Sequence, residues 1–295
     1  MTPPRPAPPG AAALMQRSFS LSFLTCLDAA PPAAIRTAAE TGYDAVGLRL
    51  LPAAPGGFAA PLMDDAALLA ETLAALRDSG LSVFDIEMIR IGPAFLPEPY
   101  KPFLETSARL GARCILVAGD DDDEARMTAS FAALCQTAAP YGLSADLEFM
   151  PQSQVRDARA AMRILTAAAQ PNAAIIVDAL HVSRSRTPLS DIAAIPRGWM
   201  NYAQICDGPA EIPQTLDGLN HAARRERLLP GDGAIDLVGL FATLPADLPV
   251  SVEVPNEKQA PALGPRAWAA RALAAAKAVL ARADAHRATI GSSAQ

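Results

Sequence analysis

Short runs of β-branched and aliphatic residues alternate with longer helical stretches along almost the whole chain, and this alternation leaves few folds open. Eight segments have the character of strands: 18–25, 45–51, 82–89, 113–118, 143–149, 174–179, 202–206 and 250–254. The stretches between or after them have helical spacing of apolar residues: 32–41, 65–79, 102–110, 124–139, 155–168, 188–195, 235–243 and 265–282. This order is typical of a parallel sheet with crossover helices.

Eight such units predict an α/β protein with a single (β/α)₈ TIM barrel, whose site lies at the carboxyl ends of the strands. A doubly wound open sheet is the alternative, but no Gly-x-Gly-x-x-Gly turn follows the first strand. We expect the barrel to span 16–285, with a disordered tail rich in Pro and Ala at 1–15 and a C-terminal tail at 286–295.

Composition excludes several classes of protein. The chain has 295 residues, of which 51% are hydrophobic, enough for a large core. Its net charge is −6 and Lys and Arg form no cluster, so we expect no nucleic-acid partner. The apolar runs are shorter than the roughly 20 residues of a membrane span. The start has no signal-like apolar core, so we expect a cytoplasmic protein. The sequence leaves open whether the protein forms a homo-oligomer.

Four of the strand-like segments carry, near their ends, a side chain that can bind a metal: Glu148, Asp178, Gln204 and Glu253. A carboxylate in such an apolar segment is costly to bury unless a cation accompanies it. Because all strands of a barrel end at the same face, we expect these four side chains to converge. Three carboxylates and an amide oxygen are natural ligands for a hard divalent cation, so the pattern predicts a metal enzyme.

Each of these residues also has a structural interpretation. Asp178 could cap a helix in the segment that follows it, since Asp is common at helix N-termini. Glu253 could form a buried ion pair. Glu148 could already lie at the solvated rim, near Pro151, and Gln204 could satisfy the backbone of a loop. The sequence leaves these alternatives open.

Three further residues are candidates for contact with a substrate. His181 follows Asp178 by three residues, so it could bind the metal, reach a substrate oxygen or make a structural hydrogen bond. Arg227 precedes a Pro-Gly and Asp-Gly turn; it could reach a phosphate, carboxylate or hydroxyl, or belong to a solvated basic turn. Glu87, on the inward face of the third strand, could hold a sugar hydroxyl or pair with Arg90 or a neighbouring strand.

The ordered motifs resemble those of the xylose isomerase-like superfamily of divalent-metal TIM barrels, over about residues 18–282. In chain order they are LEFMP at 147–151, VDALH at 177–181, QICD at 204–207, the turn at 227–233 and VEVP at 252–255. The superfamily includes sugar and sugar-phosphate isomerases and epimerases, keto-cyclitol and dehydroshikimate dehydratases, and abasic-site endonucleases. The endonucleases use a richer set of histidines than the three of this chain, which argues against that activity.

The resemblance implies one divalent metal ion bound by Glu148, Asp178, Gln204 and Glu253, with His181 and Arg227 touching the substrate. Mg²⁺ or Mn²⁺ is expected, and Co²⁺ and Zn²⁺ are the alternatives. Many epimerases of this type have His at the third ligand position, whereas Gln204 stands there as in some dehydratase branches.

The expected activity is isomerisation or epimerisation of a sugar or sugar-like α-hydroxy ketone. Glu148 and Glu253 would remove and return a proton through a metal-stabilised ene-diolate. If a β-hydroxyl departs instead, the same chemistry gives a dehydratase of a keto-cyclitol or dehydroshikimate-like substrate. Two other classes stay open: a metal-bound sugar-binding barrel without turnover, and a metal-free barrel whose acids form structural ion pairs.

Overall fold

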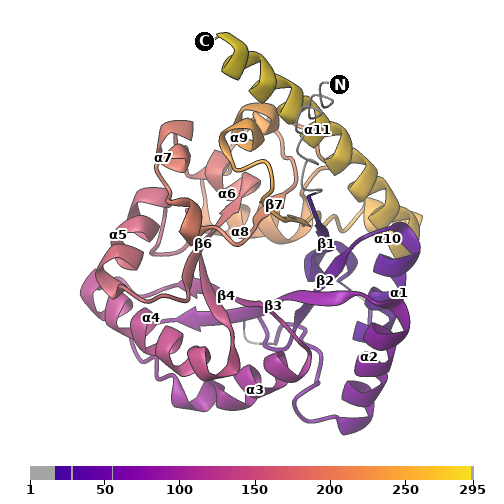
Figure 1. The fold of residues 1–295 in the computed structure, drawn as a ribbon, viewed down its shortest axis with the longest axis vertical. Coiled ribbons are helices and arrows are strands. Elements are labelled where there is room, and N and C mark those ends of the chain that lie inside the picture. The colour runs from indigo at the N-terminus through magenta and orange to yellow at the C-terminus, as the bar shows by residue number, and fades with distance from the viewer. Residues whose placement is uncertain (1–16, 28, 55, 294–295) are drawn as a thin grey trace, which may run out of the picture.

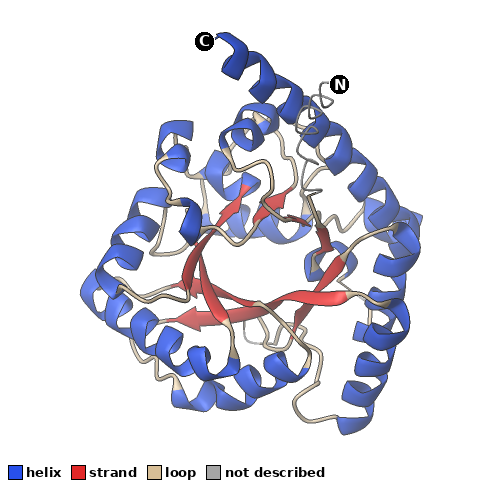
Figure 2. Ribbon diagram, in the orientation of Figure 1, coloured by secondary structure: helices blue, strands red, loops and turns tan. Residues whose placement is uncertain are grey.

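The computed structural model describes residues 17–27, 29–54 and 56–293, and the tail predicted at 1–15 lies outside the described residues. Eight parallel strands form one closed barrel in the order of the chain (Figure 2). The strands are β1 Phe19–Leu21, β2 Ala45–Arg49, β3 Ser82–Ile91, β4 Cys114–Gly119, β5 Ser144–Glu148, β6 Ala173–Asp178, β7 Ala203–Ile205 and β8 Val250–Val252. Ser20 of β1 lies beside Ser251 of β8 and closes the ring. The predicted barrel is therefore confirmed.

Helices surround the barrel on the outside (Figure 1). They are α1 Pro31–Thr41, α2 Ala66–Ser79, α3 Lys101–Arg109, α4 Glu124–Ala138, α5 Ala158–Ala168, α6 Ala179–Arg184, α7 Leu189–Ala193, α8 Leu216–Arg225, α9 Leu237–Thr243, α10 Gln259–Leu263 and α11 Pro265–Ser293. Short 3-10 turns are η1 Phe23–Cys26, η2 Glu98–Tyr100, η3 Ala139–Tyr141 and η4 Arg197–Trp199. The last helix α11 continues beyond the predicted domain boundary at 285.

Three helices were not predicted, and each has a local reason. α6 begins directly after β6 because the Asp178 carboxylate caps it. α8 begins at Thr215, whose hydroxyl oxygen accepts a hydrogen bond from the Gly218 N–H. Only Ala223 of α8 is buried, so the helix lacks the apolar stripe that sequence patterns detect. α10 has five residues and buries none of them.

Strand residues alternate between the barrel interior and the helix layer. Ile175 and Val177 pack in the large core between sheet and helices. Ile176 belongs instead to a second cluster, inside the barrel. Its members are Ala45, Phe84, Met88, Cys114, Leu116, Ala118, Met150, Ile176 and Tyr202. This interior cluster gives the site at the strand ends a largely apolar floor.

The four cysteines are free and buried. Burial raises the pKa of the Cys26, Cys135 and Cys206 thiols to about 12, so they stay protonated and unreactive. They pack as small apolar side chains. Within the described ranges, none of the helices combines the length and apolar character that crossing a membrane requires.

Candidate active site

The four residues predicted as metal ligands are buried at the carboxyl end of the barrel. Glu148 and Asp178 are the last residues of β5 and β6. Gln204 lies in β7, and Glu253 directly follows β8. Asp178 is the register neighbour of Gln204, which in turn lies beside Ser251. The structure therefore brings the four side chains together from separate strands.

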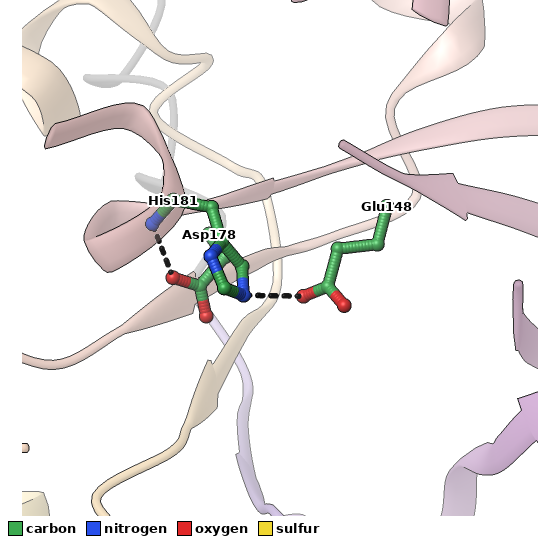
Figure 3. Close-up of side chains that lie close together, drawn as sticks. All are labelled: Glu148, Asp178 and His181. Carbon is green, nitrogen blue, oxygen red and sulfur yellow. Dashed lines mark hydrogen bonds and ion pairs between the residues drawn. The ribbon is translucent and has the colours of Figure 1, made fainter. Parts of the chain in front are cut away.

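Glu148, Asp178 and His181 form a compact group (Figure 3). Each offers one potential ligand atom, and these atoms all lie within 4.8 Å of one another. His181 Nε2 is 3.9 Å from Glu148 Oε1. The backbone N–H of His181 donates to Asp178 Oδ1 at 3.0 Å, so Asp178 also caps α6. The capping interpretation of Asp178 is thus correct, and it leaves lone pairs on the carboxylate for a second partner.

Arg227 is 2% exposed, so the interpretation as a solvated basic turn is wrong. Its Nη1 lies 2.6 Å from Asp178 Oδ2 and its Nη2 lies 2.9 Å from Glu253 Oε2. Its Nε donates to the carbonyl of Ala223 at 2.7 Å. The loop is held in place by Asp207, which accepts hydrogen bonds from the N–H groups of Gly208, Gly231 and Ile235. Arg227 is therefore an internal counter-ion for two of the predicted ligands.

Glu253 is joined to Gln204 and to the first strand. Gln204 Nε2 and Ser22 Oγ both donate to Glu253 Oε1, each at 2.9 Å. Gln204 thus contacts a side chain of the site rather than the backbone of a loop. Its Oε1 has no hydrogen-bond partner among the described residues and is buried. The amide oxygen is therefore the part of Gln204 that is free to bind a cation.

Two observations indicate that these side chains could bind a divalent cation. Within the described part of the chain, the buried atoms Glu148 Oε1, Gln204 Oε1 and His181 Nδ1 lack hydrogen-bond partners. Buried polar atoms are rarely left in this state unless an ion or water completes them. When all three acids are ionised, the single guanidinium of Arg227 compensates one of the three charges and leaves two. A divalent cation would offset both.

Burial raises the pKa of both glutamates. For Glu148, burial is the main cause, and the nearby charges of Asp178 and Glu253 add to it, so its pKa is well above the usual value. For Glu253, burial outweighs the opposing charge of Arg227 and raises the pKa to about 8. A raised pKa makes a carboxyl group a stronger base than an exposed one.

The pKa values of His181 and Asp178 are shifted downward instead. Burial lowers the pKa of His181 to about 4, so the ring is neutral at pH 7. Burial acts to raise the pKa of Asp178, but Arg227 and His181 oppose it and the net pKa is lowered. Asp178 therefore stays ionised, while His181 offers a neutral ring to a metal or to a substrate oxygen.

Glu87 pairs with Arg49 of the neighbouring strand β2, its register partner. Arg90 instead makes two hydrogen bonds to Asp120, at 2.6 and 2.8 Å. Of the alternatives for Glu87, the pair with a neighbouring strand is thus the one observed. Sequence analysis missed Arg49, because an arginine at the end of an apolar strand gives no motif of its own.

A small cavity of about 50 Å³ opens among these side chains. Every predicted site residue except Asp178 and Gln204 lines it. The residues that matter for the chemistry below are Arg49, Glu87, Arg90, Glu148, His181, Arg224, Arg227 and Glu253. A substrate in this cavity would thus contact the two glutamates, the histidine and the arginines together.

Asp85 is a buried acid that the predicted chemistry does not use. It is 0% exposed, and neither carboxylate oxygen has a hydrogen-bond partner among the described residues. Burial, followed by the charges of Glu87 and Glu253, raises its pKa well above the usual value. The folded protein therefore holds the Asp85 proton at a pH where an unfolded aspartate has lost it.

We expect Asp85→Asn to flatten the pH dependence of stability. Because the folded state binds the extra proton, the contribution of Asp85 is greatest below about pH 4 and declines as pH rises. Relative to wild type, Asp85→Asn should gain about 1–3 kcal/mol in the free energy of unfolding between pH 5 and pH 7. Urea unfolding in EDTA would measure this, with Asp217→Asn on the exposed face of α8 as control. Parallel pH profiles for wild type and Asp85→Asn would contradict it.

Comparison with known proteins supports the fold. The family model for the xylose isomerase-like TIM barrel matches residues 35–279. A search of curated proteins found no match. Among solved structures, one similar fold is that of the IOLI protein with a binding zinc atom, at TM-score 0.74 and 18% identity over 90% of this chain and 98% of that chain.

Two other similar structures are enzymes by their descriptions. The D-allulose 3-epimerase from Methylomonas sp. in complex with D-allulose has TM-score 0.66 and 18% identity, over 89% of this chain and 97% of that chain. The probable 3-DHS dehydratase AsbF from Bacillus anthracis has TM-score 0.67 and 15% identity, over 87% of this chain and 97% of that chain.

At these identities the likeness to solved structures concerns the fold alone. The chain also matches 42% of a xylose isomerase-like TIM barrel/4-hydroxyphenylpyruvate dioxygenase fusion protein, with TM-score 0.75, 19% identity and 88% of this chain covered. The resemblance seen in the sequence motifs is confirmed by the family model, which spans most of the chain. The protein belongs to the xylose isomerase-like TIM barrel family.

Proposed function

We propose that this protein is a divalent-metal-dependent isomerase or epimerase that acts on a sugar or sugar-like α-hydroxy ketone. The observation that supports this most is the position of two glutamates on one cavity. Glu148 and Glu253 both line it, from the ends of β5 and β8, which are separated by β6 and β7. A substrate between them would have a carboxyl group on each side, as removal and return of a proton require.

Glu148, Asp178, Gln204 and Glu253 would hold the metal. Oxygen ligands favour Mg²⁺ or Mn²⁺, and participation of a His181 nitrogen would favour Co²⁺ or Zn²⁺. When bound, the cation supplies Lewis-acid polarisation of the substrate oxygens beside the carbon that loses its proton.

The protein's own groups would handle the proton. Glu148 Oε1, which has no hydrogen-bond partner among the described residues, is free to take a proton from carbon. Glu253 lines the other side of the cavity and could return a proton from there. Neutral His181 can donate a ring N–H to a substrate oxygen. A general base of this kind contributes about 10²–10⁴-fold to the rate.

A metal-dependent dehydratase of a keto-cyclitol or dehydroshikimate-like substrate is the second candidate. It needs the same proton removal, followed by protonation and loss of a β-hydroxyl as water. The position of Glu253 favours it, since a carboxyl group that lines the cavity opposite Glu148 could give a proton to the departing hydroxyl. Gln204 in place of His is also compatible with this branch.

Metal binding tests the proposed site directly. After chelation and reloading with Mn²⁺, we expect one ion per wild-type chain and at least about 10-fold weaker binding by Asp178→Asn. Asp121→Asn is the matched control, because Asp121 is also a buried carboxylate after a strand, yet pairs with Arg126 outside the cavity. Elemental analysis gives the number of ions bound per chain, and calorimetric titration gives the affinity. A folded wild type that binds no ion would remove the proposed mechanism.

Proton NMR of keto-sugars and cyclitols in D₂O separates the two activities. Exchange of a carbon-bound proton for deuterium without any alkene signal supports isomerisation or epimerisation. New vinylic protons would identify the dehydratase instead. The Asp178→Asn variant should give neither signal, because it lacks the proposed metal ligand.

A further inference from the structure

Four arginine side chains line the cavity: Arg49, Arg90, Arg224 and Arg227. Three of them are paired with carboxylates of the protein: Arg49 with Glu87, Arg90 with Asp120, and Arg227 with Asp178 and Glu253. The side chain of Arg224 makes no hydrogen bond and no ion pair with any residue that the structure describes. It is therefore the cavity's free cation within the described part of the chain.

Arg224 lies between two adjoining cavities. It stands in the last turn of α8 and is half-buried. The inner cavity holds the glutamates, and the outer one has a volume of about 640 Å³. Six residues line both: Ala53, Met88, Arg90, Gln152, Asn220 and Arg224. A substrate whose reacting carbon lies between the glutamates would extend its far end past these six side chains.

The Arg224 guanidinium has no carboxylate of its own, because the one that acts on it, Asp120, is paired with Arg90. Burial lowers the pKa of its guanidinium, and the positive charges of Arg90 and Arg49 lower it further. The nearby carboxylate of Asp120 is already held by Arg90 through two hydrogen bonds. A half-buried cation among like charges is unfavourable unless an anion joins it. A guanidinium binds carboxylate or phosphate oxygens through two parallel hydrogen bonds.

We propose that Arg224 receives an anionic group, a carboxylate or a phosphate, at the end of the substrate that lies away from Glu148 and Glu253. This inference rests on the proposed function, which places the reacting carbon of the substrate between the two glutamates. The side-chain amides of Gln152 and Asn220 line the same passage and supply further N–H donors for anionic oxygens. The substrate class is thus an acidic sugar, sugar phosphate or cyclitol acid rather than a neutral sugar.

Two matched pairs of probes test this by calorimetric titration of the full chain in EDTA. The phosphate pair is D-xylulose 5-phosphate against D-xylulose, and the carboxylate pair is 3-dehydroshikimate against its methyl ester. We expect the anionic member of at least one pair to bind wild type about 10-fold or more tightly than its neutral counterpart. The pair that shows the preference identifies the anionic group.

The variants assign the preference to one residue. Arg224→Met should abolish it, whereas Arg225→Met should retain it, because Arg225 is exposed and pairs with Glu257. Equal binding of both members of both pairs by wild type would overturn the inference, as would an Arg224→Met variant that keeps the preference. Absence of metal binding and turnover with the preference intact would instead overturn the proposed function alone.

Discussion

Replacing Glu148 by glutamine is expected to lower turnover by about 10²–10⁴-fold and, in the same variant, to stabilise the metal-free protein. Glu148 Oε1 is buried and has no hydrogen-bond partner among the described residues. Burial and the charges of Asp178 and Glu253 make its ionised form unfavourable. Glutamine keeps the shape and removes the charge, so we expect a gain of about 0.5–2 kcal/mol in the free energy of unfolding.

The opposite signs of these two effects distinguish a functional carboxylate from a structural one. Deuterium exchange into the substrate in D₂O measures turnover, and urea unfolding in EDTA measures stability. Glu124→Gln is the control, because Glu124 is exposed and its surface pair with Arg163 is worth little. Full turnover together with a loss of stability would mean that Glu148 serves only as a structural ion-pair partner.

Replacing Arg227 by methionine should have the largest effect on stability. The guanidinium lies between Asp178 and Glu253, and all three side chains are buried. Removal of one partner from a buried ion pair typically costs about 3–5 kcal/mol, because the remaining charges are left uncompensated. The Arg227→Met site would then hold three carboxylates without a cation of its own.

Mn²⁺ should restore much of that loss. A ligand that binds only the folded state stabilises it by mass action, and the more negative site should bind the ion more tightly. We therefore expect the Mn²⁺-induced gain in unfolding free energy to be larger for Arg227→Met than for wild type. Arg126→Met is the control, since Arg126 is half-exposed and pairs with Asp121 outside the cavity. An equal gain in all three proteins would show that Arg227 does not share its carboxylates with the metal.

The architecture and the strand ends could be predicted from sequence because both depend on local patterns. Eight apolar runs alternating with helical spacing predicted the barrel, and the two-residue period of a strand puts Asp178 on the same face as Ile176. The strand order of a barrel then brings the four predicted ligands to one face without any further information. Whether a metal binds there stays a prediction.

The contacts that tune the site depend on distances that a sequence does not contain. Arg49 meets Glu87 through the register of β2 and β3, which shifts between Val46 and Leu48. Arg227 is buried only because Asp207, twenty or more residues earlier, fixes the loop that carries it. The local sequence around Arg227 is the same whether the arginine lies in a surface turn or is buried. Both interactions therefore became visible only in three dimensions.

The closing strand of the barrel has a consequence for the newly made protein. β8 pairs with both β1 and β7, and the indole N–H of Trp268 in α11 donates to the carbonyl of Val254 just after it. On a growing chain, β1 therefore keeps one unpaired edge until residues 250–252 have been made. Such an edge is a template for pairing with other chains, so slow synthesis would prolong the risk of aggregation. Because Glu253 comes directly after this last strand, a prematurely terminated chain would also lack one of the four predicted ligands.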